Sequence, residues 1–217
     1  TDGEDDWTPL VNISQSGSTS APIIVVDSNN VTHAIWFNLF GEYHHAQSGA
    51  DGLWTEPEVL TLPFFNIEPR VIYGPNDLVY TFWLTDRTVM YTRVKSTTMG
   101  AELTWNPVQT VATDALAYDV FVDDDGVIHV AYIQQSPLES QPAGIYYRSK
   151  PVSRVWTSPV AVYTSDYFRN MRASQAYINI AAGELLKDSG EESDIEKHLF
   201  VAWNDPLQYN SMVSSTV

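Results

Sequence analysis

Trp54-Thr55-Glu56-Pro57 is one of four short segments in which a Trp is closely followed by a Pro. The other three are Trp7-Thr8-Pro9, Trp105-Asn106-Pro107 and Trp156-Thr157-Ser158-Pro159. Along the chain, the four Trp residues are separated by 47, 51 and 51 positions. A repeat with a period of about 50 residues predicts a row of similar supersecondary units.

Each repeat contains short runs of apolar and aromatic residues. The first runs are Pro22–Val26, Pro69–Tyr73, Tyr118–Val122 and Ala176–Ile180. The second runs are Val31–Trp36, Leu78–Trp83, Val127–Tyr132 and Leu199–Trp203. The third runs contain Tyr43, Tyr91, Tyr146-Tyr147 and Tyr209, and the Trp–Pro segments are expected to be the fourth strands. Asn, Asp, Gly and Pro between the runs accept the dihedral angles that hairpin turns require.

Four short strands per repeat predict a four-stranded antiparallel sheet, which is the blade of a β-propeller. We therefore expect an all-β fold, a β-propeller of four four-stranded antiparallel blades in one domain, 1–217. The expected blades cover residues 14–60, 61–111, 112–162 and 163–217. The last blade ends on a third-strand segment, so residues 1–13 are expected to supply its outer strand, close the ring and cover a sheet edge. Two alternatives stay open, a piece of a larger propeller and a dimer that forms one eight-bladed ring.

The composition limits the partners of the chain. A net charge of −16 argues against nucleic acid or an anionic membrane surface as the main partner. The sequence contains no Cys, which excludes disulfides and thiolate metal sites, and no apolar run long enough to span a membrane. Much of the acidic charge lies in residues 183–198, where we expect a solvated, mobile insertion in the last blade. The spacing of an EF-hand calcium loop is absent from this stretch.

A resemblance enters at the segment before the second Trp. Ser48-Gly49-Ala50-Asp51-Gly52-Leu53-Trp54 resembles the Asp-box of sialidase-like propellers, also called the BNR repeat. Thr1-Asp2-Gly3-Glu4-Asp5-Asp6-Trp7 is a looser copy. In that family the Asp caps a turn and the Trp packs between sheets, away from the ligand. The resemblance therefore implies structural roles for Ser48, Asp51, Gly52 and Trp54, and an extracellular or cell-surface location of the secreted bacterial type.

The resemblance does not extend to the catalytic residues of the family. Sialidases use three Arg side chains on the substrate carboxylate, a Tyr nucleophile with a Glu, and an Asp acid/base. The Arg-Ile-Pro signature of the family is missing, and Glu68-Pro69-Arg70-Val71 does not replace it. We expect a non-catalytic module that recognises a carbohydrate or a protein surface. The alternatives are a divergent exo-sialidase, another glycoside hydrolase or a fragment of one, and a structural or assembly propeller.

A binding site is expected at the loops that gather on one face of a propeller around its channel. Amides and carboxylates beside exposed aromatic rings suit sugars, whose C–H faces stack on rings while their hydroxyls form hydrogen bonds. The candidate ligand-binding residues are Asn38, Glu42, Phe64, Phe65, Glu68, Arg70, Asp86, Arg87, Gln134, Tyr167, Arg169, Arg172, Asn204 and Asp205. No residue is assigned a catalytic role, and no cofactor is expected.

The histidines are not expected to bind a metal. His33 and His129 occupy equal positions in the first and third repeats, where the other repeats have Tyr80 and Phe200. A position filled by His, Tyr and Phe is typical of packing. His44 and His45 follow each other on an expected strand, so their side chains point to opposite faces of the sheet. The oligomeric state is left open.

Overall fold

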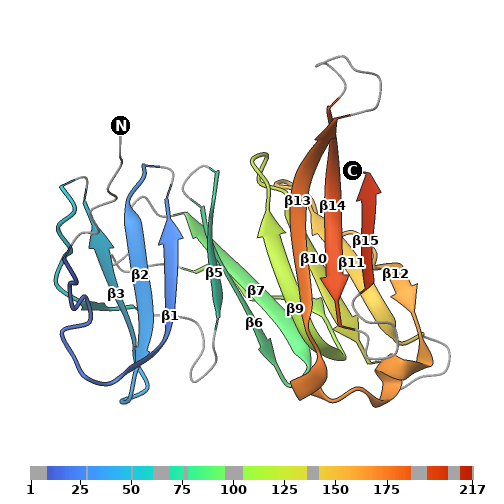
Figure 1. Cartoon of the computed structure of the whole chain (residues 1–217), viewed down its shortest axis with the longest axis horizontal. Coiled ribbons are helices and arrows are strands. Elements are labelled where there is room, and N and C mark those ends of the chain that lie inside the picture. Colours follow the sequence, from blue (N-terminus) through green and yellow to red (C-terminus); the bar gives the residue numbers. More distant parts are fainter. Residues whose placement is uncertain are drawn as a thin grey trace, which may run out of the picture.

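The computed structural model describes residues 9–27, 29–49, 51–60, 69–75, 78–95, 105–135, 142–186, 195–204 and 211–216. These residues form antiparallel β-sheets in chain order, with two short 3-10 helices at Asp166–Asn170 and Ala173–Gln175. Figure 1 shows the sheets in a row, from β1–β3 at one end to β13–β15 at the other. The prediction of an all-β fold of antiparallel sheets is confirmed.

Strand order within every sheet follows the chain. The first sheet consists of β1 (Thr19–Val26), β2 (Thr32–Asn38), β3 (Tyr43–Ser48) and β4 (Glu58–Val59). The second consists of β5 (Arg70–Gly74), β6 (Leu78–Thr85), β7 (Thr88–Lys95) and β8 (Gln109–Ala112). The third consists of β9 (Ala115–Val122), β10 (Ile128–Gln134), β11 (Gly144–Lys150) and β12 (Val160–Thr164). The fourth consists of β13 (Ile178–Leu186), β14 (Ile195–Trp203) and β15 (Ser211–Thr216).

The second strands of the second and third sheets are buried on both faces. Along β10, Ile128 to Ile133 are all buried, and β6 has a similar pattern. A strand with neighbouring sheets on both sides reads as a continuous apolar run, which is why these segments stand out in the sequence.

The Trp–Pro segments were expected to be the fourth strands, but the fourth strands lie beyond them. They begin four residues after the Trp: β4 follows Trp54, β8 follows Trp105 and β12 follows Trp156. Trp54 itself makes only an isolated bridge with Ser48. The reason is that Pro has no N–H to donate to a β-ladder, so regular pairing starts beyond it.

Apolar residues from consecutive sheets pack into a core between them. One cluster joins the first and second sheets through Ile35, Tyr43, Val71, Val79 and Trp83. The cluster between the second and third sheets contains Tyr80, Phe82, Tyr91, Val120, Val130 and Tyr132. The cluster between the third and fourth sheets contains Ile133, Ile145, Phe168, Ile178, Val201 and Trp203.

The repeated Trp residues each lie on the same side of their own sheet. Trp105, in the segment between β7 and β8, packs into the cluster shared with the first sheet. Trp156, in the segment between β11 and β12, packs into the cluster shared with the second sheet. Tyr91 of the second sheet meets Trp156 edge-on, with ring centroids 5.6 Å apart. Each of these Trp side chains therefore fills the contact with the preceding sheet.

Closure of the ring by residues 1–13 is not confirmed. In the described part of this segment, residues 9–13 form no strand, and Ile13 packs on Ala34, Trp36 and Ala46 of the first sheet. Within the described residues, β15 pairs with β14 alone. Figure 1 shows β15 and the first sheet at opposite ends of the row.

Part of the expected insertion at 183–198 is regular structure. Residues 183–186 and 195–198 extend β13 and β14 as a paired hairpin, with Gly183 opposite His198 and Leu186 opposite Ile195. Residues 187–194 lie outside the described residues. Among the helices that the structure describes, none is long and apolar enough to cross a membrane.

Candidate functional site

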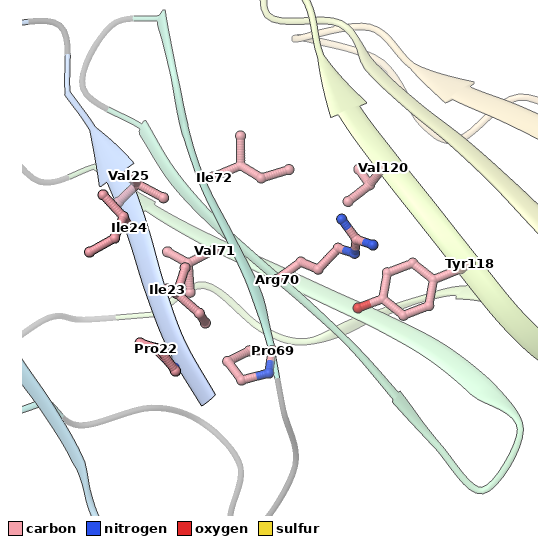
Figure 2. Close-up of a pocket in the computed structure, with 10 residues that line it drawn as sticks. All are labelled: Pro22, Ile23, Ile24, Val25, Pro69, Arg70, Val71, Ile72, Tyr118 and Val120. Atoms are coloured by element: carbon pink, nitrogen blue, oxygen red, sulfur yellow. The ribbon is translucent and has the colours of Figure 1, made fainter. Parts of the chain in front are cut away.

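A hollow of about 540 Å³ opens beside the first strands of three consecutive sheets. Its walls are mostly aliphatic and come from β1, β5 and β9. The lining residues are Pro22, Ile23, Ile24, Val25, Pro69, Arg70, Val71, Ile72, Tyr118 and Val120. Figure 2 shows the side chain of Arg70 extending from β5 toward Tyr118 and Val120 of β9. A largely apolar hollow with few polar groups is the usual form of a ligand site.

Asp119 holds the guanidinium group of Arg70. Arg70 Nη1 lies 2.9 Å from Asp119 Oδ1, and about half of the Arg70 side chain is exposed while that of Asp119 is buried. The other carboxylate oxygen accepts a hydrogen bond from the backbone N–H of Ile180, at 2.9 Å. Asp119 therefore ties its own strand β9 to β5 and to β13, and so links three sheets.

The positions of Arg70 and Asp119 on their strands follow from the sequence around them. Pro69 precedes the first residue of β5, where a strand tolerates Pro because no ladder hydrogen bond is lost. Tyr118 and Val120 line the hollow while Asp119, between them, lies on the opposite face of β9. Asp119 was not among the predicted site residues. A single carboxylate inside an otherwise apolar strand was the signal that could have identified it, because a buried charge requires partners.

Arg87 lies in a second polar cluster, outside the hollow. Asp86 and Arg87 form the tight turn between β6 and β7, and both have positive φ, at 45° and 61°. The Arg87 side chain donates to the carbonyl of Gln135 at 3.0 Å and lies 3.8 Å from Asp114. Gln135 in turn donates its amide to the carbonyl of Arg169. These contacts join the ends of the second and third sheets to the segment before β13.

The remaining predicted residues mostly bond to nearby backbone. Asn38 is nearly buried, and its Oδ1 accepts from the N–H groups of Phe40 and Glu42, each at 2.9 Å. Its amide nitrogen lies 3.2 Å from the Glu42 carboxylate. Asn204 Oδ1 accepts from the N–H of Tyr177 at 2.9 Å. Asn38 and Asn204, the polar residues after the second strands of the first and fourth sheets, thus organise a turn and an inter-sheet loop.

The predicted aromatic candidate Tyr167 lies in the first 3-10 helix. Tyr167 is half-buried and packs edge-on against Phe168, with ring centroids 5.6 Å apart. Arg169 pairs with Asp166 at 2.9 Å, and Arg172 precedes the second 3-10 helix. Tyr177 is 65% exposed, and the sequence interpretation had missed it because it was assigned to a strand.

The other predicted residues lie at the end of β10 or outside the described part of the chain. Gln134 ends β10 and is half-buried. Phe64, Phe65, Glu68 and Asp205 lie outside the described residues.

The hairpin at Ser48–Trp54 has the contacts of a capped turn. Asp51 Oδ1 accepts from the N–H of Leu53 at 3.1 Å, and the N–H of Gly52 donates to the carbonyl of Gly49 at 3.0 Å. Gly52 has φ of 74°, which a residue without a Cβ adopts at little cost. Asp51 therefore stabilises the turn itself.

Two equivalent side-chain clamps occur in the first and third sheets. In the first, His33 Nε2 lies 3.2 Å from Asp27 Oδ2, and His33 Nδ1 lies 2.9 Å from His45 Nε2. In the third, His129 Nε2 lies 3.1 Å from Asp123 Oδ2, and His129 Nδ1 lies 2.8 Å from the Tyr147 hydroxyl. Both His side chains are buried, as a packing role requires.

Burial and neighbouring groups lower the pKa values of two residues in the first clamp, His45 and Asp27. Burial, reinforced by the electrostatic effect of the neighbouring His33, lowers the pKa of His45 to about 4. Burial opposes ionisation of Asp27, but hydrogen bonds from Val31, His33 and Asn29 outweigh burial and hold the pKa of Asp27 below its ordinary value.

The second sheet replaces the clamp by packing. Tyr80 stands where the other two sheets have His33 and His129, and Gly74 stands where they have Asp27 and Asp123. A Cβ atom on Gly74 would lie 2.6 Å from Tyr80 Cε2. The ring of Tyr80 therefore fits only because residue 74 is a glycine and has no side chain. Within the described ranges, no three His, Asp or Glu side chains gather in a way that could hold a metal ion.

Comparison with known proteins finds similarity at the level of solved structures. No protein-family model and no curated protein matches the chain. A polysaccharide lyase described as an ulvan lyase overlaps 89% of this chain and 48% of its own, with TM-score 0.47 and 12% identity. The NanB sialidase of Streptococcus pneumoniae overlaps 90% of this chain and 29% of its own, with TM-score 0.45 and 13% identity.

A third similar structure is the α-L-arabinofuranosidase Arb93A of Fusarium graminearum. It overlaps 94% of this chain and 67% of its own, with TM-score 0.48 and 11% identity. The chain spans about half the length of the ulvan lyase that it overlaps. At these identities and TM-scores, the overlaps assign no residue of this chain to a function.

Proposed function

We propose that the chain is a non-catalytic, propeller-type recognition module whose hollow binds an anionic group. The ligand is an acidic glycan, and an acidic side chain on a protein surface is the alternative with the same chemistry. The observation that supports this proposal is the Arg70 side chain, half-exposed in the hollow and fixed from behind by buried Asp119.

The geometry of Arg70 suits a carboxylate or sulfate. A guanidinium group has five N–H donors in a planar fork. Within the described residues, its ion pair is made through Nη1 to a single oxygen of Asp119. The guanidinium retains donors for a ligand, and the carboxylate behind it restricts its rotamers before binding. Preorganisation of this kind reduces the entropy lost when a ligand binds.

The walls of the hollow also fit part of a glycan. Tyr118 of β9 stands beside Arg70 of β5. The ring of Tyr118 can lie against the C–H face of a sugar there. Ile23, Ile24 and Ile72 supply further apolar surface. The net charge of −16 opposes an anionic ligand at long range, but salt screens charges more than about 8 Å apart at physiological ionic strength.

The lining chemistry favours binding over hydrolysis. Glycosidases require two carboxylates, or a Tyr nucleophile with an acidic partner. Among the described residues that line the hollow, there is one Arg and one Tyr and no carboxylate. Asp119 lies behind Arg70 with both oxygens engaged. A sialidase holds its substrate carboxylate with three Arg side chains, but Arg87, Arg169 and Arg172, the other predicted Arg residues, are not among the residues that line the hollow.

The test is binding of acidic and neutral glycans to the purified chain, measured by calorimetry. We expect acidic glycans to bind, and Arg70→Ala to weaken binding about 10- to 100-fold, since a charged hydrogen bond contributes about 1.5–3 kcal/mol. Arg154→Ala is the matched control, because Arg154 is exposed on a turn outside the hollow. Circular dichroism confirms that each variant is folded.

Two results would contradict the proposed function. Equal affinity of Arg70→Ala and Arg154→Ala for every glycan would remove the hollow as the site. Hydrolysis of a sialoside or an arabinoside that disappears in Arg70→Ala would replace the binding module by an enzyme.

A further inference from the structure

A second hollow, of about 230 Å³, lies on the second sheet, where β7 meets the segment that leads into β8. The three lining residues from β7 are buried or half-buried, and the three from the other segment are exposed. The lining residues are Tyr91, Thr92, Arg93, Asn106, Pro107 and Gln109. Because β8 is the last strand of this sheet, the second hollow opens at the edge of the sheet.

The second hollow is separate from the hollow around Arg70, and the two share no lining residue. Arg70 of β5 pairs with Phe82 of β6, and Phe82 pairs with Tyr91 of β7. Directly paired residues point to the same face of a sheet, so Arg70 and Tyr91 share the face that meets the third sheet. They stand on opposite sides of β6, with buried Phe82 between them.

An irregularity in the pairing of β7 with the fourth strand lies at the second hollow. The N–H of Asn106 donates to the carbonyl of Arg93 at 3.0 Å, and the regular ladder begins only at Gln109. The two residues between them, Pro107 and Val108, stand opposite a single residue of β7. An extra residue of this kind interrupts the ladder, and Pro107 has no N–H to donate to it.

The same irregularity recurs in the first and third sheets, where a Thr side chain bonds across it. Thr55 and Thr157 stand where the second sheet has Asn106. Their Oγ1 atoms accept hydrogen bonds from the N–H groups of Gln47, at 3.1 Å, and Ser149, at 2.9 Å. Among the described residues, the hydrogen bonds of Asn106 are made by its backbone. The second sheet thus lacks a structural side-chain bond that both neighbouring sheets have.

Arg93 is a second departure from the repeat at the same place. It stands where the first and third sheets have Gln47 and Ser149, so of the three four-stranded sheets only the second has a charge at this position. A local departure from an otherwise regular pattern is expected at functional sites. Both departures, Arg93 and Asn106, line the second hollow.

The electrostatics of the second hollow favour an anion. Among its described lining residues there is one cation, Arg93, and no carboxylate. The charge of Arg93 also reaches Lys150, the last residue of β11, which is 6% exposed. Burial and then the charge of Arg93 lower the pKa of Lys150. Two cationic side chains near each other give a positive potential that attracts negative ligands.

We propose that the second hollow binds one acidic sugar unit, a monosaccharide that carries a carboxylate. The guanidinium fork of Arg93 matches the two oxygens of a carboxylate. The amides of Asn106 and Gln109 each offer donors and an acceptor, which sugar hydroxyls require. A volume of about 230 Å³ lies below the range of about 300–1,000 Å³ for larger ligands, so the second hollow suits a single unit.

Backbone NMR of the 24.3 kDa chain tests this site, because amide shifts distinguish the two hollows. Methyl glucuronide is the probe, and methyl glucoside is its neutral match. We expect millimolar glucuronide to shift the amides of Arg93, Asn106 and Gln109. The affinity of the glucoside should be lower by about 10-fold or more, since it lacks the charged hydrogen bonds. Arg93→Gln should weaken glucuronide binding to the same extent, whereas Arg154→Ala, on a turn outside both hollows, leaves it unchanged.

Asn106→Thr separates a binding role from a structural one. The substitution restores the Thr of the other two sheets, whose hydroxyl accepts a backbone N–H, so the melting temperature should not fall. Glucuronide binding should weaken by about 3- to 10-fold, because one amide is lost. Equal shifts with the glucuronide and the glucoside, shifts that persist in Arg93→Gln, or unchanged affinity in Asn106→Thr would each overturn the proposal. Shifts confined to Arg70 and Tyr118 would also overturn it, while supporting the site of the proposed function.

Discussion

Acid should destabilise the first sheet through His45, and replacing His45 by Tyr should remove that sensitivity. Tyr is the residue that the third sheet has at the equivalent position, where Tyr147 bonds to His129 at 2.8 Å. His45→Tyr therefore converts one natural clamp into the other, and His45→Gln is a smaller polar control.

The sign follows from the direction of the pKa shift. The pKa of His45 falls from 6.5 to about 4 in the folded protein, because burial disfavours the charged ring. The unfolded chain takes up the proton first as the pH falls, so its free energy drops relative to that of the folded state. The contribution to stability is complete above about pH 6.5 and is lost between pH 6.5 and about 4.

The size follows from the same shift. One pKa unit corresponds to about 1.4 kcal/mol, so the full loss at pH 4 is about 3 kcal/mol. Asp27 acts in a separate window, because its pKa lies below 3.8 and its contribution is lost only as the pH falls further.

The assay is urea unfolding at a series of pH values between 7.5 and 4. We expect the free energy of unfolding of the unmodified chain to fall by about 3 kcal/mol more than that of His45→Tyr over this range. Comparing two variants cancels the carboxylates that both contain. Parallel curves for the two proteins, within about 0.5 kcal/mol, would refute the assignment of the acid sensitivity to His45.

Three further substitutions test the contacts between and within sheets. Asp119→Ala should lower the free energy of unfolding by about 2–4 kcal/mol, because it leaves the Ile180 N–H buried without an acceptor; urea unfolding measures this. Gly74→Ala should cost about 1–3 kcal/mol through the 2.6 Å approach to Tyr80, and Tyr80→His in the same chain should restore most of it. Thr157→Val should cost about 1 kcal/mol, because Thr157 Oγ1 accepts from the N–H of Ser149 at 2.9 Å; an unchanged melting temperature would contradict this role.

The strand pattern was predictable because it is local. Alternation, turn residues and the recurring Trp place the first three strands of every repeat close to where the structure has them. The fourth strands were misplaced by a few residues. The recurring Trp–Pro segments are the conspicuous feature of the sequence and were therefore taken as the fourth strands. Pro lacks the N–H group that a β-ladder requires, so the pairing of the fourth strand begins after the Pro.

The candidate site was only partly predictable. Arg70 was among the expected residues, but the loop residues expected beside it, such as Asn38 and Arg87, bond to their own turns and to neighbouring loops. Polarity in a loop does not distinguish a ligand contact from a backbone cap. That distinction depends on distances between segments far apart in the chain.

The sequence by itself determined the all-β architecture, the order of the strands and the number of residues in each repeat, since these depend on side-chain periodicity and turn chemistry within about 50 residues. Only the tertiary structure decided that Asp119 reaches Arg70 and Ile180 across three sheets, and that β15 and residues 9–13 stand at opposite ends of the row. Contacts between sheets depend on how the sheets pack, and no local pattern encodes the position of one sheet relative to another.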